Sequence, residues 1–114
     1  MNRRGAAAEN LAADFLRRHG LRLLEQNYRC RFGEIDLVMR EGCTTVFVEV
    51  RQRAGSAFGS AAESITGAKR ARLLAAARHY IARHGGDAAL RFDALLLTGA
   101  DPPRIEWIKD AIGE

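Results

Sequence analysis

The sequence predicts an α/β domain in which a mixed β-sheet is flanked by helices, and two observations support this fold class. Apolar residues recur at helical spacing near the start of the chain and again in its second half, and segments rich in Val, Ile and Phe lie between these regions. The order is helix, three strands, helix and strand, then a short tail, which is typical of a hairpin-rich sheet covered by helices. The 114 residues suffice for one compact domain, which we expect to span residues 1–114.

The first expected helix covers residues 5–19. Leu11 and Phe15 follow helical spacing, and Gly20 provides a C-terminal stop. Three strands are expected after it, at residues 21–29, 33–40 and 44–53, with Glu41 and Gly42 as the turn signal between the second strand and the third.

A longer helix is expected from a cap at Thr66 to His84, where a pair of glycines ends it. Within this helix Leu74 and Ile81 are expected to pack inward. The next strand covers residues 91–98 and is followed by a short edge strand at residues 104–107.

The late part of the chain carries one charged pair that we interpret as structural. Arg91 and Asp93 alternate on one face of the late strand and are expected to form a salt bridge. Trp107, the single tryptophan, is expected to anchor the C-terminal tail.

The composition excludes several classes of protein. Hydrophobic residues make up 47% of the chain and charged residues 28%, as in ordinary globular domains. The apolar runs are too short for a membrane span, and no signal-peptide region stands at the beginning. Cys30 and Cys43 are too few for a disulfide scaffold and lack the spacing of a zinc site. We therefore expect a cytoplasmic protein with reduced thiols and no membrane partner.

Two acidic residues meet in the central hairpin. A turn centred between Gly42 and Cys43 would place Asp36 directly opposite Glu49. The alternation would turn both carboxylates and Arg51 to one face, and would place Ile35 on the other, core face with its apolar neighbours at 37 and 39.

Like charges opposed at about 5 Å destabilise a sheet, so this pair needs a counter-charge. A divalent cation such as Mg²⁺ or Mn²⁺ would supply it, because these ions prefer oxygen ligands. Alternatively, Arg51 would supply part of it, in a network of Asp36, Arg51 and Glu49 that only braces the sheet. The residues alone leave both interpretations open.

The motifs in this region resemble those of a known family. Residues 33–38, Gly-Glu-Ile-Asp-Leu-Val, and 46–53, Val-Phe-Val-Glu-Val-Arg-Gln-Arg, closely resemble the paired motifs of the YraN-like uncharacterised protein family. Residues 27–29, the segment around Lys69 and Arg72, and residues 91–93 fit in order, so the resemblance covers nearly the whole chain. That family resembles a branch of the PD-(D/E)xK nuclease superfamily, near the archaeal Holliday-junction resolvases.

The resemblance implies a restriction-endonuclease-like core in which Asp36 and Glu49 bind Mg²⁺, with Mn²⁺ as a substitute. It implies Glu9 as a third carboxylate from the first helix, and the carbonyl of Val50 is a further candidate ligand. Without this resemblance, we would interpret Glu9 as a favourable negative charge in the first turn of a helix.

One position departs from the superfamily pattern. A lysine normally stands two residues after the second acid, where it orients the attacking water and stabilises developing charge, but this chain has Arg51. Arginine grips a phosphate well and does not readily release a proton. Either Arg51 acts as an electrostatic clamp, or Lys69 reaches the site from the second helix.

Basic residues are concentrated in one part of the chain. Residues 50–86 carry seven bases against one acid, Glu63, within a chain whose net charge is +4. The seven bases are Arg51, Arg53, Lys69, Arg70, Arg72, Arg78 and Arg83. On the second helix Lys69, Arg72, Ala76, His79 and Arg83 recur at helical spacing as one stripe. Such a stripe is either a solvated helix face or a surface for a phosphate backbone, and its position beside the acidic pair favours nucleic acid.

These observations predict a Mg²⁺-dependent endonuclease that acts on DNA rather than RNA, with branched DNA as a candidate substrate. The expected catalytic residues are Asp36, Glu49 and either Arg51 or Lys69, and the expected nucleic-acid contacts are Arg53, Arg70, Arg72, His79 and Arg83. Paired cleavage of a junction would require a homodimer. The alternatives are a non-catalytic nucleic-acid-binding module and an interaction domain with a purely structural acidic pair.

Overall fold

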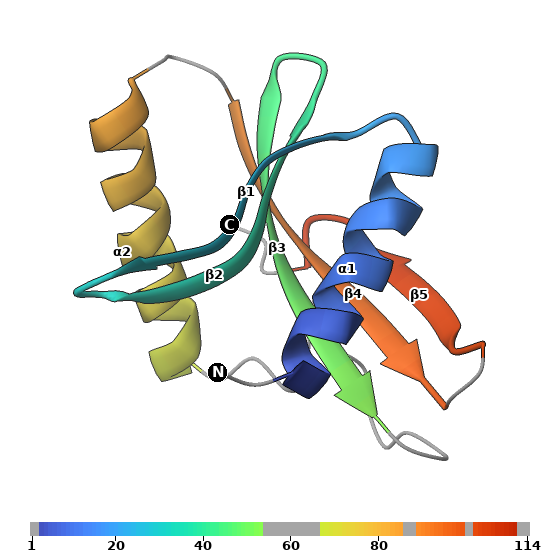
Figure 1. Cartoon of the computed structure of the whole chain (residues 1–114). Coiled ribbons are helices and arrows are strands. Elements are labelled where there is room, and N and C mark those ends of the chain that lie inside the picture. Colours follow the sequence, from blue (N-terminus) through green and yellow to red (C-terminus); the bar gives the residue numbers. More distant parts are fainter. Residues whose placement is uncertain (1–2, 54–66, 86–88, 100–101, 112–114) are drawn as a thin grey trace.

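The computed structural model describes residues 3–53, 67–85, 89–99 and 102–111. Its elements, in chain order, are α1 (Arg3–Arg18), β1 (Arg22–Cys30), β2 (Gly33–Glu41), β3 (Thr44–Arg53), α2 (Gly67–His84), β4 (Ala89–Thr98) and β5 (Arg104–Ile108) (Figure 1). The predicted α/β class and the predicted order of elements are confirmed. The expected edge strand is present as β5 and is one residue longer than expected.

The sheet has five strands in the spatial order β1-β2-β3-β4-β5. All neighbouring strands are antiparallel except β3 and β4, which are parallel. A parallel pair needs a crossover between its strands, and α2 lies in that connection. The sheet is therefore mixed, as predicted.

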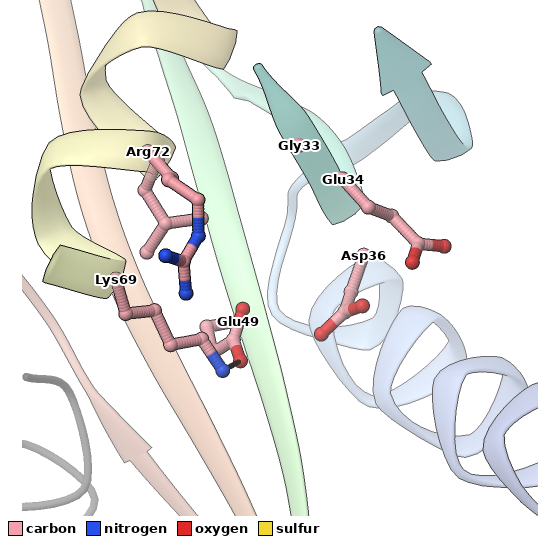
Figure 2. Close-up of a pocket in the computed structure, with 7 residues that line it drawn as sticks. Gly33, Glu34, Asp36, Glu49, Lys69 and Arg72 are labelled. Atoms are coloured by element: carbon pink, nitrogen blue, oxygen red, sulfur yellow. Dashed lines mark ion pairs between the residues drawn. The ribbon is translucent and has the colours of Figure 1, made fainter. Parts of the chain in front are cut away.

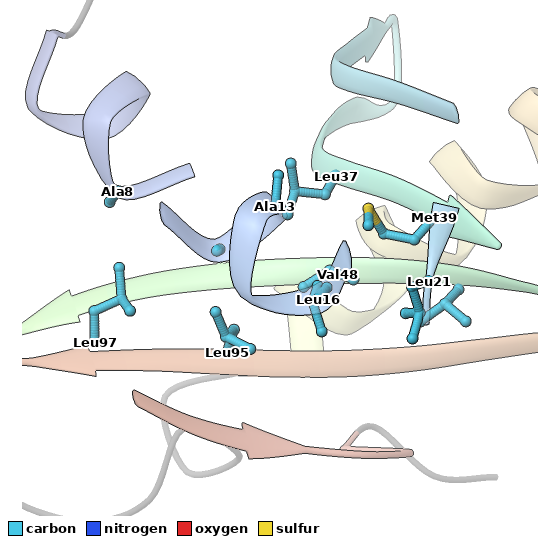
Figure 3. Packing of buried hydrophobic residues seen from close by; sticks show 11 residues of the cluster. Ala8, Ala13, Leu16, Leu21, Leu37, Met39, Val48, Leu95 and Leu97 are labelled. Carbon is cyan, nitrogen blue, oxygen red and sulfur yellow. The ribbon is translucent and has the colours of Figure 1, made fainter. Parts of the chain in front are cut away.

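The two helices cover opposite faces of the sheet, and each has its own apolar cluster. On the α1 face, small residues such as Ala8 and Ala13 let the helix lie close to Leu37, Val48 and Leu95 (Figure 3). On the other face, α2 packs over a cluster of aromatic and aliphatic residues that contains Tyr28, Ile35, Val38, Phe47, Leu73, Ala76, Ala77, Tyr80 and Phe92. Among the described residues, neither helix is both long and apolar enough to cross a membrane.

The end of α1 confirms the predicted glycine stop. Gly20 has φ +94°, its N–H donates to the Arg17 carbonyl at 3.0 Å, and the Leu21 N–H donates to the Leu16 carbonyl at 3.0 Å. These two bonds form a Schellman motif, in which a residue with positive φ satisfies the last carbonyls of the helix.

The inward face of α2 differs from the prediction. Leu73, Ala77 and Tyr80 are buried against the sheet, whereas Leu74 and Ile81 pack only at the margin of the cluster. The reason is the alanine content of this helix: alanines fit either a core or a surface position, so the few large residues did not fix the face. The expected cap, Thr66, lies outside the described residues.

Ile35 is also placed differently from the prediction. It packs with Val38 and Phe47 under α2, not with Leu37 on the α1 face. Ile35 and Val38 can share a face only if the alternation of β2 is broken between them. The break lies at Asp36, the residue on which the candidate site depends.

Candidate active site

The break in β2 coincides with the end of its pairing with β3. The predicted register is confirmed from Leu37, which pairs with Val48, to Glu41. Continued, it would bring Glu49 opposite Asp36, as predicted, and Val50 opposite Ile35, but the pairing of β2 with β3 ends at Leu37, so the predicted direct pair of Asp36 with Glu49 is not formed. Instead the Val50 N–H donates to the carboxylate of Asp36, with N to Oδ2 at 2.8 Å.

Asp36 therefore replaces a backbone acceptor at the point where two strands separate. Because the N–H and carbonyl of a residue in an extended strand point to the same neighbour, the Val50 carbonyl also faces this opening. The backbone position expected to hold a metal ion is thus directed toward Asp36.

A pocket of about 210 Å³ lies between the sheet and the beginning of α2. Its lining residues are Gly33, Glu34 and Asp36 from β2, Glu49 from β3, and Lys69, Arg72 and Leu73 from α2 (Figure 2). The structure thus brings the two predicted acids and two predicted bases together in one pocket, with carboxylates on the strand side and cations on the helix side.

Glu49 is buried and is paired with both candidate cations. Its Oε2 forms an ion pair with the ammonium of Lys69, drawn as a dashed line in Figure 2, and lies 3.3 Å from Nε of Arg51. The Arg51 Nε is itself buried and lacks hydrogen-bond geometry to any partner among the described atoms. Lys69 therefore does reach the site, as one of the two predicted arrangements required.

The pKa of Asp36 is strongly affected by its surroundings. Burial, and next the negative charge of Glu49, raise the pKa of Asp36 to about 7, against the lowering effect of the Val50 N–H. The charges of Glu9 and Glu34 raise the pKa further. A carboxyl that ionises near neutral pH beside a second acid is a frequent feature of functional sites.

Glu9 lies near the site but does not complete a closed cluster of ligands. Because α1 begins at Arg3, Glu9 stands beyond the first turn, and the helix-terminus interpretation of its charge is wrong. Its side chain is buried, and Oε1 has no hydrogen-bond partner among the described residues. In the same part of the chain, no three His, Cys, Asp or Glu side chains are arranged to hold a metal ion.

The donor set still fits Mg²⁺. This ion usually takes one or two protein carboxylates and keeps several water ligands, so Asp36 and Glu49 suffice as side-chain ligands. The unpartnered Glu9 oxygen indicates missing positive charge or a missing donor nearby, since a buried polar atom without a partner costs free energy.

The predicted basic stripe is only partly an exposed surface. Its Arg72 and Arg83 are exposed, as is Arg70, a predicted nucleic-acid contact outside the stripe. Ala76 is fully buried, and the His79 ring forms a hydrogen bond with the Tyr28 hydroxyl. The stripe is therefore interrupted in its middle. Arg53 ends β3, and its side chain lies outside the described residues.

Three residues of the pocket lining were not predicted as site residues: Gly33, Glu34 and Leu73. Glu34 pairs with Arg29 at 3.2 Å, and its alternation with Asp36 in β2 was a signal available in the sequence. Gly33 has φ +148°, and a Cβ at this position would lie 3.7 Å from the Cβ of Arg72. The start of β2 therefore lies close to α2, and no local pattern in the sequence predicts this contact.

Comparisons with known proteins place the chain in a family. Residues 8–97 match the model of the uncharacterised protein family UPF0102. A UPF0102 protein of Nitrosomonas europaea is 58% identical over 97% of this chain and 94% of its own length. Another, from Methylobacillus flagellatus, is 54% identical over 97% of both chains. The chain therefore belongs to UPF0102, the YraN-like family that its motifs indicated.

Proposed function

We propose that this chain is a Mg²⁺-dependent endonuclease that hydrolyses phosphodiester bonds in DNA, with branched DNA as its expected substrate. The observation that carries the proposal is the pocket itself, where Asp36 and Glu49 face Lys69 and Arg72. Phosphodiester hydrolysis uses acids that bind a metal ion and bases that bind the phosphate. In this pocket the two kinds of residue lie opposite each other. The helix-flanked mixed sheet is compatible with the restriction-endonuclease-like core that the sequence motifs imply.

The acidic side of the pocket supplies the metal ligands. Asp36 and Glu49 offer carboxylate oxygens, and the Val50 carbonyl faces the same opening. A bound Mg²⁺ would activate a water molecule and neutralise charge on the scissile phosphate. The raised pKa of Asp36 fits this role, because burial and the charge of Glu49 both oppose its ionisation and a bound cation would offset them.

The basic side supplies charge for the phosphate. The Lys69 ammonium lies at Glu49, where it can hydrogen-bond a water or a phosphate oxygen, and Arg72 adds a second cation at the rim. Arg51 stays charged throughout the reaction, so it can stabilise negative charge but cannot move a proton. We therefore assign to Lys69 the part that the superfamily gives to a lysine at the position of Arg51.

The decisive experiment measures nicking of linear, flapped and four-way DNA with Mg²⁺ or Mn²⁺. Asp36→Asn and Glu49→Gln keep the shape of each side chain but remove its charge, and we expect each to lower the rate by about a thousandfold or more. Asp14→Asn is the matched control, because this acid is exposed on α1 and should leave the rate unchanged. Equal cutting by all variants would refute the proposal.

A second experiment tests the assignment of Lys69. Lys69→Met should lower the rate about a hundredfold, as expected when one donor to the developing charge is lost. Adding Arg51→Lys to that variant should recover part of the rate, because it returns a lysine to the usual position. If Lys69→Met cuts as fast as the wild type, the assignment is wrong and Arg51 alone provides the charge.

The pairing of Glu49 with Lys69 and Arg51 also favours a second candidate, a non-catalytic nucleic-acid-binding module. In that case the acids are already neutralised and the bases hold DNA without turnover. Binding that weakens with salt and with Arg72→Ala, while every DNA substrate stays intact in Mg²⁺ and in Mn²⁺, would establish this candidate.

Cleavage by a purified dimer, and not by a monomer, would support the expected homodimer.

A further inference from the structure

We propose that the tip between β1 and β2, formed by Arg31 and Phe32, binds an unpaired base next to the phosphate in the pocket. The inference deepens the proposed function and rests on it, since it names the form of DNA that the site accepts. That form is a strand with bases outside a duplex, as in a flap, a fork or the branch point of a junction.

The tip presents an aromatic ring to solvent. Cys30 pairs with Gly33, so Arg31 and Phe32 form a tight two-residue connection between the strands. Phe32 is 37% exposed, and among the described residues only Leu11 and Leu90 are other large apolar side chains with comparable exposure. Of these three residues, Phe32 is the one next in sequence to a residue that lines the pocket, Gly33.

Cationic and aromatic groups surround this ring. The guanidinium carbon of Arg31 lies 4.9 Å from the centre of the Phe32 ring. On the α2 side, the His79 ring is 5.9 Å from Phe32 in an edge-to-face arrangement. Aromatic rings and guanidinium planes beside positive charge are the usual stacking surfaces for unpaired bases.

The tip is adjacent to the candidate active site. Phe32 directly precedes Gly33, which lines the pocket, and consecutive Cα atoms are about 3.8 Å apart. Gly33 also approaches Arg72, the cation at the rim of the pocket. A phosphate in the pocket would thus bring the base of a neighbouring nucleotide to Phe32.

This geometry selects against uninterrupted duplex. In a duplex the faces of the bases are stacked on one another, and proteins reach only their edges in the grooves. Phe32 offers a ring to a base face, which becomes available only when the base has left the stack. The proposal therefore assigns the preference for branched or single-stranded segments to two residues at the tip.

The test measures binding by fluorescence anisotropy in EDTA, so that cleavage plays no part. Phe32→Ala should weaken binding to a single-stranded oligonucleotide about tenfold, and should change binding to the matching duplex less than twofold. Phe32→Trp should retain the affinity. Leu90→Ala is the matched control, an equally exposed apolar residue at the start of β4, and should change neither affinity.

A base analogue reports the contact directly. 2-Aminopurine in the single strand should lose fluorescence on binding to the wild type and to Phe32→Trp, and keep it with Phe32→Ala. Equal losses of affinity for both DNA forms, or no loss for either, would overturn the inference even if the protein cleaves DNA. Binding of single strands through Phe32 without any cleavage would sustain the inference and refute the proposed nuclease instead.

Discussion

Asp93 and Asp36 are both aspartates set into the sheet beside a second acid, yet their surroundings are opposite in kind. Asp93 lies on β4, and each of its oxygens accepts two hydrogen bonds. Asp36 lies on β2 and accepts a hydrogen bond from a backbone N–H, that of Val50. The comparison separates a carboxylate that holds the fold together from one that is available for chemistry.

The surroundings of Asp93 are fully compensated. Arg91 donates from Nε and Nη2 at 2.8 Å each, Trp107 donates from its indole at 2.9 Å, and the Asp110 N–H donates at 2.9 Å. Arg91 also contacts Glu41 at 2.6 Å, and these two carboxylates hold the pKa of the guanidinium above its usual range. The salt bridge expected for Arg91 and Asp93 is confirmed, and Trp107 joins β5 to it.

The negative charge of Asp36 is only partly compensated by its surroundings. Its nearest acid, Glu49, carries the ion pairs with Lys69 and Arg51, while Asp36 has its raised pKa. A protein that can satisfy one buried carboxylate with four donors leaves the other short of positive charge at a pocket. Departures of this kind from local consistency are expected where a site has a function.

The same substitution at both positions should therefore have opposite effects on stability. Asp93→Asn places an amide against the donors of Arg91 and leaves a partly buried cation short of its partner, so we expect a loss of about 3 kcal/mol in the free energy of unfolding. Asp36→Asn removes a charge that opposes Glu49 and should leave stability at pH 7 unchanged or raised. Urea unfolding of the two variants measures both effects, and equal losses would contradict the comparison.

The pH dependence of stability should differ in the same way. The pKa of Asp36 is raised from 3.8 to about 7 in the folded state, so the folded protein binds the extra proton in this interval. The contribution of Asp36 to the free energy of unfolding is fully present below about pH 4. It is lost as the pH rises through 7, at up to about 1.4 kcal/mol per pH unit. Asp36→Asn lacks this loss, so its advantage in urea midpoint over the wild type should grow between pH 4.5 and 8.

Magnesium provides the control for that measurement. At pH 8, above the raised pKa of Asp36, Mg²⁺ should stabilise the wild type in proportion to the occupancy of the site. The same concentration should stabilise Asp36→Asn much less. If the difference in stability between the wild type and Asp36→Asn changes with neither pH nor Mg²⁺, Asp36 is an ordinary surface carboxylate.

Much of the fold was accessible from the sequence, because its signals are local. Gly20 ends a helix through its own backbone, and the short turn at Gly42 fixes the register of β2 and β3. The side of β2 that Ile35 faces was not accessible, since it depends on a strand break that the side chain of Asp36 itself stabilises. The alanine-rich α2 likewise gave no unique inward face.

The site was accessible only in part, for a related reason. The hairpin register from Leu37 to Glu41 places Asp36 and Glu49 near each other although the pairing stops at Leu37, and the motif around them contained Glu34. The contact between Lys69 and Glu49 joins residues far apart in the chain, and its existence depends on how α2 packs over the sheet. Spacing alone could therefore name Lys69 as a candidate but could not decide between it and Arg51.

The smallest expected effect is that of a lysine at the edge of the group of residues around Asp93. Lys109 is half-exposed, with Nζ 4.6 Å from the centre of the Trp107 ring and 3.9 Å from Glu41. An exposed cation in such contacts contributes about 0.5 kcal/mol, so Lys109→Ala should lower the urea midpoint only slightly, and Lys109→Arg should restore it. If Lys109→Ala costs as much as Asp93→Asn, the stabilisation extends to the surface and does not depend on a buried carboxylate with four donors. The contrast with Asp36 would then have to rest on exposure to solvent, not on the number of hydrogen bonds.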